Sequence, residues 1–373
     1  MRILHVHSGN IFGGVERILV ALARHKQVSP GFEHSFALCF EDQLSRELTV
    51  AGAEVIQLPK VRIRNPIDIL KTRRALASVL KNERFDLAIT HSAWGQSLFA
   101  STIQKAGVAN AFWLHTRSKG NSAMERMAQL NFPDAVISVS HWVDQSASQL
   151  FPGAPSFVVY SPLAIDRAAY QNASRVAMRE ALGVRNDQVL ILQASRMEAW
   201  KGHRILLEAL KSLAHEKRWV CVIAGGAERP DEEDYVEDLK QMAQRLGIDE
   251  RVRFLGRRHD VPALMMAADI YCQANLEAEG FSIAFVEAFY ARLPIVTSAL
   301  GGALEIVFAN SGALVKAGDA DALARELERL IADGALRRRL GENGRQRALE
   351  RCDPVRQFGE LEQVFRQIVA RHE

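Results

Sequence analysis

The sequence predicts an α/β protein made of two doubly wound domains, and three observations carry that prediction. Short apolar runs typical of buried strands alternate with amphipathic helical patterns along the whole chain. Such alternation produces parallel sheets with helices on both faces. Two series of this kind occur, and 373 residues is a length expected of two domains. The content of 48% hydrophobic and 24% charged residues is ordinary for a globular protein.

The apolar runs place a series of strands in each half of the chain. The first half gives Ile3–His7, Ser35–Cys39, Glu54–Leu58, Leu87–His91, Ala111–His115, Ala135–Val139 and Phe157–Tyr160. The second half gives Val189–Ala194, Trp219–Ala224, Val252–Leu255, Ile270–Cys272, Ile295–Thr297 and Gly312–Val315. Apolar residues at three- and four-residue steps predict helices between them at Val15–His25, Ile67–Lys81, Gly202–Ala214, Glu232–Leu246 and Ala320–Asp333.

The domain junction is expected between Ser161 and Asp166. Pro162 disfavours regular structure there, and the next clear strand begins only at Val189. We therefore expect one domain over residues 1–165 and a second over 166–355. The tail from Asp353 onward is predicted to be helical because its apolar residues recur at helical spacing.

Charge and cysteine content narrow the classes of protein. A net charge of +3 is too small to indicate a nucleic-acid-binding protein. The four cysteines form no CxxC pair, which is typical of free thiols in a reducing compartment. Neither a signal peptide nor an apolar stretch near the ~20 residues of a membrane span is found, so we expect a cytoplasmic protein. The basic residues between Lys60 and Arg84 form either a solvated helix face or a peripheral contact with the inner membrane surface.

Ligands of doubly wound sheets bind beyond the carboxyl ends of the strands, and with two domains the expected site is the cleft between them. After the first expected strand, Gly13 and Gly14 precede a helix, where the backbone can approach an anion closely. A purely structural tight turn is the alternative. The pattern is not GxGxxG, which disfavours a dinucleotide-dependent dehydrogenase.

Two segments of the second half carry charged residues in the same kind of position. Arg196 and Lys201 follow the strand Val189–Ala194, where two cations suit a diphosphate, with ordinary surface cations as the alternative. Glu279 and Glu287 are spaced to lie near one face if Gly280 opens a helix, and a carboxylate suits a pair of sugar hydroxyls. That helix start would offer backbone N–H groups of Phe281, Ser282 and Ile283 to an anion.

Two further patterns are less specific. Gly301 and Gly302, with Glu305 behind them, follow the strand Ile295–Thr297. His91 and His115 each end an apolar strand, where a histidine can bond a sugar hydroxyl, assist proton movement or serve the fold alone.

Evidence for a metal site is weak. The DxD sequence Asp319-Ala320-Asp321 directly precedes an expected helix, which favours a helix cap over a metal site. No zinc spacing, Walker loop or GxSxG elbow occurs.

In combination and in order, these motifs resemble the retaining GT-B glycosyltransferases of family 4, the large "glycosyl transferases group 1" family. The resemblance covers nearly the whole chain and is most specific from Gln193 to Val307. It implies the GT-B architecture, in which two Rossmann-like domains face a deep cleft. Residues 1–165 would form the acceptor-side domain, with a C-terminal helix at 356–373 packing back on it, and residues 166–355 would bind the nucleotide-sugar donor.

The resemblance also implies a role for each motif. Arg196 and Lys201 would hold the donor diphosphate, Glu279 would contact the transferred sugar, and Glu287 would bind the ribose. His115 would lie near the sugar. The remaining donor contacts would come from the backbone, at Gly13, Gly14, Gly280, Phe281, Ser282 and Ile283. Many members of the family carry Gly or Pro where this chain has Ser282, which still supplies the backbone N–H.

The function expected is transfer of a hexose from a nucleoside diphosphate sugar, such as a UDP-sugar or GDP-sugar, to a hydroxyl of a glycan, lipid-linked or small-molecule acceptor. The resemblance implies retention of configuration by a same-face, internal-return displacement without metal or other cofactor. Two alternatives stay open: a non-catalytic subunit that binds nucleotide sugars, and a nucleotide-sugar epimerase of the same fold.

Overall fold

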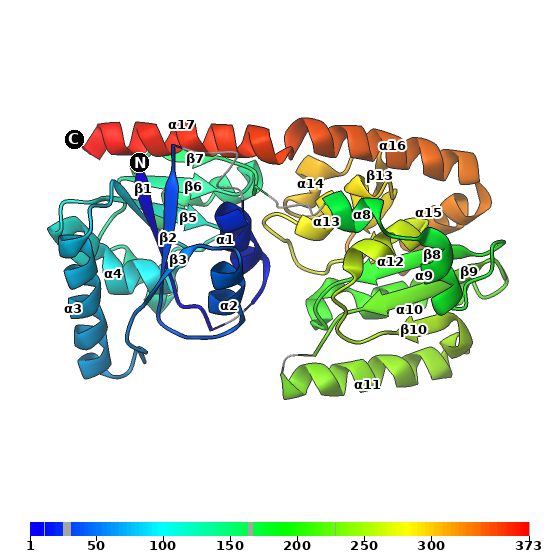
Figure 1. Cartoon of the computed structure of the whole chain (residues 1–373). Coiled ribbons are helices and arrows are strands. Elements are labelled where there is room, and N and C mark those ends of the chain that lie inside the picture. Colours follow the sequence, from blue (N-terminus) through cyan, green and yellow to red (C-terminus); the bar gives the residue numbers. More distant parts are fainter. Residues whose placement is uncertain (11, 25–30, 163–166, 228, 373) are drawn as a thin grey trace. The chain divides into compact units, whose positions relative to one another are not determined.

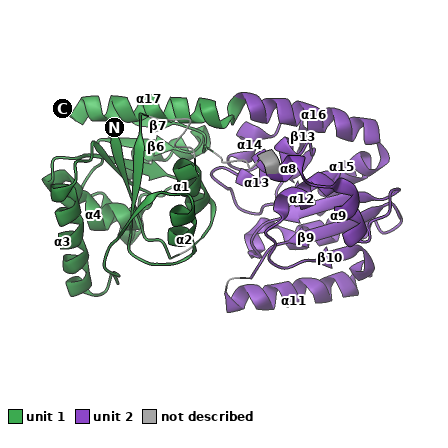
Figure 2. Cartoon of the chain, in the orientation of Figure 1, with its two compact units in different colours: residues 1–164, 351–373 green, residues 165–350 purple. Residues whose placement is uncertain are grey.

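The computed structural model of the chain describes residues 1–10, 12–24, 31–162, 167–227 and 229–372 (Figure 1). It divides into two compact units, shown in different colours in Figure 2. Unit 1 comprises Met1–Ala164 together with Arg351–Glu373, and unit 2 comprises Ile165–Glu350. Unit 1 is therefore assembled from both ends of the chain.

Unit 1 contains a seven-stranded sheet of order β3-β2-β1-β4-β5-β6-β7, in which all the paired strands are parallel. Its strands are β1 Arg2–His7, β2 Glu33–Leu38, β3 Glu54–Gln57, β4 Leu87–Thr90, β5 Ala109–Leu114, β6 Ala135–Ser138 and β7 Ser156–Val158. Its helices are α1 Gly14–Arg24, α2 Gln43–Val50, α3 Pro66–Asn82, α4 Ala93–Lys105, α5 Ala123–Ala128, α6 His141–Asp144, α7 Ala147–Leu150 and α17 Pro354–His372. The strand order reverses between β1 and β4, which makes their carboxyl ends the switch point of this sheet.

Unit 2 contains a six-stranded parallel sheet of order β10-β9-β8-β11-β12-β13. Its strands are β8 Val189–Ala194, β9 Trp219–Ala224, β10 Val252–Phe254, β11 Ile270–Gln273, β12 Ile295–Ser298 and β13 Gly312–Val315. Its helices are α8 Arg167–Gln171, α9 Arg175–Ala181, η1 Ala199–Lys201, α10 His203–Ser212, α11 Pro230–Arg245, η2 Asp249–Arg251, α12 Val261–Ala267, α13 Ile283–Tyr290, α14 Ala303–Ile306, α15 Ala320–Ala332 and α16 Gly334–Arg351. Here the order reverses between β8 and β11.

The strand predictions are confirmed, since every predicted run corresponds to a strand of one of the two sheets. The five helices predicted between the strands are present as α1, α3, α10, α11 and α15, and the helical tail is α17. His25, the predicted last residue of the first helix, lies outside the described residues. The parallel, doubly wound α/β class is therefore correct for both units.

Among the described helices that were not predicted, α16 is the longest. α16 is rich in arginine and has Gly341 and Gly344 in its interior, a pattern without a clear apolar stripe. The structure explains both glycines by packing. A Cβ on Gly341 would lie 1.9 Å from the carbonyl oxygen of Arg292, and one on Gly344 would lie 2.3 Å from the ring of Phe289. These glycines allow α16 to pack closely against the end of α13.

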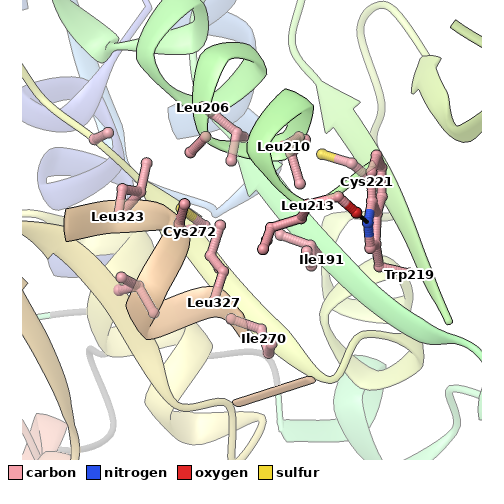
Figure 3. Close-up of a cluster of buried hydrophobic side chains, with 14 of the residues drawn as sticks. Ile191, Leu206, Leu210, Leu213, Trp219, Cys221, Ile270, Cys272, Leu323 and Leu327 are labelled. Carbon is pink, nitrogen blue, oxygen red and sulfur yellow. Dashed lines mark hydrogen bonds between the residues drawn. The ribbon is translucent and has the colours of Figure 1, made fainter. Parts of the chain in front are cut away.

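Each sheet is covered by apolar side chains from its helices. In unit 2, Leu206 and Leu210 of α10 and Leu323 and Leu327 of α15 belong to one buried cluster with strand residues such as Ile191 (Figure 3). Trp219 joins this cluster and donates its indole N–H to the carbonyl of Leu213 at 2.8 Å. In unit 1, α17 (red in Figure 1) closes the core, because Phe365 contacts the rings of Phe32 and His34.

The four cysteines are buried and form no disulfide, as predicted. Burial raises the pKa of Cys39 and of Cys221 to about 12, so these thiols are poor nucleophiles at neutral pH. None of the helices among the described residues is both long and apolar enough to cross a membrane.

Candidate active site

The loop after β8 holds a nearly buried lysine. Lys201, only 6% exposed, ends the short helix η1, and Gln193 fixes its backbone by donating to its carbonyl oxygen at 3.0 Å. The ammonium group lies 4.0 Å from the ring centroid of Trp200. It also lies 2.8 Å from Oε1 of Glu279. Because a buried ammonium needs a compensating partner, the sequence builds this cation into the site rather than leaving it at the surface.

Glu279 reaches that lysine from the loop after β11, the strand next to β8. Two side chains from the carboxyl end of β11 face its other oxygen, Asn275 at 3.3 Å and Gln273 at 3.5 Å. Both amides are almost fully buried. The reversal of strand order between β8 and β11 thus brings together a cation and a carboxylate that are far apart in the sequence.

Gly202 allows the loop after β8 to approach the loop after β11 closely. Its φ of +75° belongs to the left-handed region, and a Cβ there would lie 1.7 Å from the carbonyl oxygen of Ala274. One step along, the amide of Leu276 donates to the carbonyl of Trp200 at 2.7 Å. The backbones of the two loops are therefore in direct contact, which fixes the positions of Lys201 and Glu279.

The glycine pair Gly301-Gly302 supports the same loop from the other side. A Cβ on Gly301 would lie 2.6 Å from the carbonyl oxygen of Glu279, and one on Gly302 would lie 2.3 Å from that of Gly280. The amide of Gly302 also donates to the carbonyl of Glu279 at 2.9 Å. Packing against the Glu279 loop therefore accounts for this pair.

The helix after Glu279 begins later than the sequence predicted. α13 starts at Ile283, with Ser282 as its N-cap, and not at Gly280. The side chain of Ser282, 3% exposed, makes no capping hydrogen bond. The residues from Gly280 to Ser282 are thus a loop that leads into the helix start. Glu287 lies in the second turn of α13 and is half-buried.

Glu279 and Glu287 both affect the pKa of one buried phenol, that of Tyr271. Tyr271 of β11 donates to the carbonyl of Ala194 and contacts Oε1 of Gln273, both at 2.9 Å. Burial raises the pKa of Tyr271 well above its ordinary value, and the charges of Glu279 and Glu287 raise it further. Both carboxylates therefore lie within electrostatic range of Tyr271.

Arg196 stands apart from this pair. Its side chain is 43% exposed and lies 3.0 Å from Glu198, a neighbour on the same loop. The structure thus places Arg196 beyond β8, as predicted, but pairs it with a different carboxylate from Lys201.

In unit 1, the carboxylate of Glu16 accepts a hydrogen bond from the predicted glycine turn. The amide of Gly13 donates to Glu16 at 2.7 Å, and the other oxygen of Glu16 lies 3.3 Å from Nε2 of His7. A Cβ on Gly13 would approach nothing closer than 3.5 Å. Packing inside unit 1 therefore does not account for Gly13, and Gly14 opens α1.

His115 directly follows β5 and is partly exposed, whereas His91 after β4 is 4% exposed. Their rings are joined by an Nδ1···Nε2 contact of 3.1 Å. Burial and the charge of His7 lower the pKa of His115 to about 3. At neutral pH His115 is therefore an uncharged hydrogen-bonding group.

Two cavities lie at carboxyl ends of strands. One of about 380 Å³ lies beyond β9 and β10 of unit 2 and is lined partly by Met197, Gly225, Gly226, Phe254 and Arg257. One of about 220 Å³ lies at the switch point of unit 1 and is lined by Ser8, Asn10, Phe40, Val61, Ser92 and Trp94.

The DxD sequence caps a helix, as predicted. Asp319 accepts a hydrogen bond from the amide of Ala322 at 2.7 Å at the start of α15. Within the described residues no group of three or more His, Cys, Asp or Glu side chains has the arrangement of a metal site.

Comparison with known families agrees with this geometry. The family described as "Glycosyl transferases group 1" matches residues 174–347, and "Glycosyltransferase Family 4" matches residues 12–167. Together the two matches span most of both units. The chain is a family 4 glycosyltransferase.

Several curated relatives of this glycosyltransferase act on different acceptors. It is 30% identical over 232 residues to the GDP-mannose-dependent alpha-(1-6)-phosphatidylinositol monomannoside mannosyltransferase of Mycolicibacterium smegmatis, a match that covers 59% of each chain. It is 22% identical over 331 residues to the N-acetyl-alpha-D-glucosaminyl L-malate synthase of Bacillus anthracis, covering 86% of this chain and 82% of the relative.

Solved structures show that the glycosyltransferase has the GT-B fold. Anabaena Alr3699/HepE in complex with UDP-glucose is 25% identical, with a TM-score of 0.84, over 98% of this chain and all of that one. A glycosyltransferase from Rickettsia africae is 22% identical, with a TM-score of 0.85.

The sequence analysis did not predict the residues that support Lys201 and Glu279 in the candidate site. Gln193, Gln273 and Asn275 hold Lys201 and Glu279, and none of the three was singled out. A signal was present, because an amide side chain in or just after an otherwise apolar buried strand needs a polar partner.

Proposed function

We propose that the enzyme transfers a hexose from a nucleoside diphosphate sugar to a hydroxyl acceptor, with retention of configuration and without a metal ion. The observation that carries this proposal is the contact of 2.8 Å between Lys201 and Glu279 at the switch point of unit 2. It sets a cation suited to a diphosphate beside a carboxylate suited to sugar hydroxyls.

The position of each residue supports its proposed contact with the donor. Lys201 and Arg196 bind the diphosphate, and the exposed guanidinium of Arg196 exchanges Glu198 for phosphate oxygens. Glu279 accepts hydrogen bonds from the hexose, and Glu287 accepts them from the ribose. The backbone from Gly280 to Ile283, which leads into α13, contacts the sugar and the phosphate.

The nucleobase enters the cavity of about 380 Å³ beyond β9 and β10. That cavity begins at Met197, the residue after Arg196, so a base there leaves its diphosphate near the cations. Apolar side chains and glycine backbone line most of it, which suits a flat heterocycle read by backbone groups. We expect uracil or guanine as the base, because relatives use GDP-mannose and a structural neighbour holds UDP-glucose.

The acceptor binds to unit 1, at the cavity of about 220 Å³. Its rings of Phe40 and Trp94 can stack on a sugar or polyol, and Ser8 and Ser92 offer hydroxyl groups. Gly13 and Gly14 let the backbone approach the donor diphosphate. His115 binds a sugar hydroxyl and is not the base, since its lowered pKa keeps it neutral.

The reaction is a same-face displacement. The bond from the anomeric carbon to the diphosphate oxygen breaks, a bond to the acceptor oxygen forms on the same face, and the hydroxyl proton passes to the departing diphosphate. Lys201 and Arg196 stabilise the negative charge that develops on the leaving group. This mechanism needs no second carboxylate of the glycosidase type.

Calorimetry with UDP-glucose and GDP-mannose tests the donor site without knowledge of the acceptor. We expect one of the two to bind wild type and to bind Lys201→Met much more weakly, with exposed Lys211→Met as the matched control. Slow hydrolysis of the bound donor, followed by proton NMR, should release the hexose first as the anomer present in the donor. Release of the opposite anomer would overturn retention.

The alternatives give different results in the same experiment. A non-catalytic subunit would bind the donor and never hydrolyse or transfer its sugar. An epimerase would change the hexose while it is still attached to the nucleotide, or release a different hexose.

We also propose that the acceptor or its carrier lies at an anionic membrane surface. The segment from Lys60 to Arg84 includes α3, on which Ile67 is 62% and Leu70 49% exposed beside the exposed Lys71 and Arg74. Exposed apolar and basic side chains on one helix suit the headgroup region of a bilayer.

A further inference from the structure

Four histidines of unit 1 form a hydrogen-bonded chain that spans four neighbouring strands of the sheet. Nδ1 of His34 lies 2.9 Å from Nε2 of His5, and Nδ1 of His5 lies 3.0 Å from Nε2 of His91. Nδ1 of His91 then lies 3.1 Å from Nε2 of His115. The chain leads from β2 through β1 to the carboxyl ends of β4 and β5, where His115 is partly exposed.

The chain is shielded by aromatic rings. Phe36 stacks on His5 at 5.1 Å, Phe365 of α17 packs against His34, and Trp113 lies 5.5 Å from His91 and 5.6 Å from His115. The three histidines before His115 are between 0 and 6% exposed. Burial lowers the pKa of His5 and His91 well below the ordinary value, so these rings are neutral.

In such a chain of neutral imidazoles, the tautomer of each ring depends on the tautomers of its neighbours. Each ring has one N–H, and each of the three contacts needs one donor and one acceptor. Either all four rings carry hydrogen on Nδ1, or all four carry it on Nε2. The tautomer of His115 therefore depends on that of His34, although His5 and His91 lie between the two rings.

We infer that His91, His5 and His34 are positioning residues that hold His115 in a single tautomer, so that its outer nitrogen meets the substrate hydroxyl as a donor only or as an acceptor only. The inference rests on the proposed function for the role of His115. His7 is outside the chain, because its Nδ1 accepts from the amide of Gly9 at 3.0 Å and its Nε2 faces Glu16.

Nitrogen NMR of the ¹⁵N-histidine-labelled protein tests the chain without any turnover, since protonated and unprotonated ring nitrogens have well-separated shifts. At pH 7.5 we expect His5, His34, His91 and His115 to be neutral and to carry hydrogen on the same ring position. A cationic ring among the four, or two opposed tautomers, overturns the inference and leaves the proposed function intact.

A substitution at the far end tests the coupling. In His34→Phe, which keeps a ring beside Phe365, we expect two tautomers at His115 and at least a three-fold fall in kcat for donor hydrolysis, with KM for the donor unchanged. His34→Asn, whose amide can donate or accept, should restore both. Phe36→Leu removes the ring on His5 and spares the nitrogen contacts, so it should leave the His115 signals as in wild type.

Unchanged His115 signals in His34→Phe overturn the coupling. If that variant does not fold, the wild-type spectrum decides alone. Loss of donor binding in Lys201→Met with a uniform tautomer in wild type would support both proposals, whereas a uniform tautomer without donor binding would refute only the proposed function.

Discussion

At the scale of single residues, the centre of the proposed donor site is the contact between Lys201 and Glu279. The ammonium is buried and fixed by a carboxylate, a ring and its own tethered backbone. In the proposed donor site, a diphosphate would meet a cation that is already in place and needs little reorganisation. This preorganisation is the source of most electrostatic catalysis in enzymes.

Replacing Lys201 by methionine keeps the stem and removes the charge. We expect kcat for release of the nucleoside diphosphate to fall roughly 10²- to 10³-fold, the usual loss for one transition-state stabiliser. The rate should be compared with that of Lys211→Met, which alters an exposed lysine of α10. Equal rates in both variants would refute the role of Lys201.

Gly202 offers a test of the loop contact. Gly202→Ala places a Cβ 1.7 Å from a carbonyl oxygen, in addition to the strain of a positive φ. Gly247→Ala introduces the strain alone, because its φ is +66° and nothing lies within 4 Å of its Cβ. Thermal unfolding should show a loss of about 1 kcal/mol at Gly247 and a clearly larger loss at Gly202. Similar losses would mean that the two loops can separate at little cost.

The sequence predicted the positions of the charged residues well and their partners poorly. Lys201 and Glu279 were recognised because charged residues after buried strands are conspicuous. Gln273, Asn275 and the chain through His5 and His34 were missed, since a hydrogen bond between different strands depends on sheet order and register. A local sequence pattern predicts neither the order of the strands nor their register.

At the scale of elements, prediction succeeded where a local sequence pattern marks the element. It failed where tertiary packing decides the structure. Strands were found because continuous apolar runs mark buried parallel strands. α16 was missed because its two interior glycines oppose a helix locally, and only the close approach of α13 makes them favourable. The start of α13 was misplaced for a similar reason, since Gly280 belongs to a loop held by Gly302.

Helix α3 carries the prediction on membrane binding. Its Arg73 donates to the backbone of α4, whereas Lys71 and Arg74 are exposed. Replacing Lys71 and Arg74 together by glutamine should weaken binding to phosphatidylserine vesicles by about 2 kcal/mol, ~30-fold. Co-sedimentation at two salt concentrations measures this, with Lys211→Gln/Lys217→Gln as the control. Equal binding by both double variants would exclude α3 as the contact.

At the scale of the whole molecule, metal dependence separates the proposed mechanism from one that uses a divalent cation. Excess EDTA should leave the rate of nucleoside diphosphate release unchanged, because Lys201 and Arg196 supply the charge and Asp319 is occupied as a helix cap. The rate should be measured with EDTA and again after added Mg²⁺. Inhibition reversed by Mg²⁺ would contradict the metal-free mechanism.

Acid should affect unit 1 more than unit 2. Burial lowers the pKa of His7 to about 4 and of His115 to about 3, and those of His5 and His91 also fall, whereas in unit 2 only His203 shows such a shift among the described residues. Below pH ~6.5 the unfolded chain takes up protons that the folded unit refuses, so stability falls by up to about 1.4 kcal/mol per pH unit for each histidine.

The stability of each unit between pH 7 and pH 5 can be measured by hydrogen exchange of its backbone amides. Unit 1 should lose stability more steeply, and equal slopes for the two units would show that the histidines are not buried as neutral groups.

The assembly of unit 1 from both ends of the chain bears on biosynthesis. The strands of unit 1 leave the ribosome before unit 2, yet Phe365, which contacts Phe32 and His34, is made only after unit 2. Unit 2 can complete its core while unit 1 still exposes an apolar face. A nascent chain halted before α17 would therefore carry a complete unit 2 and an incomplete unit 1, so synthesis of α17 is the step that lets unit 1 reach its native state.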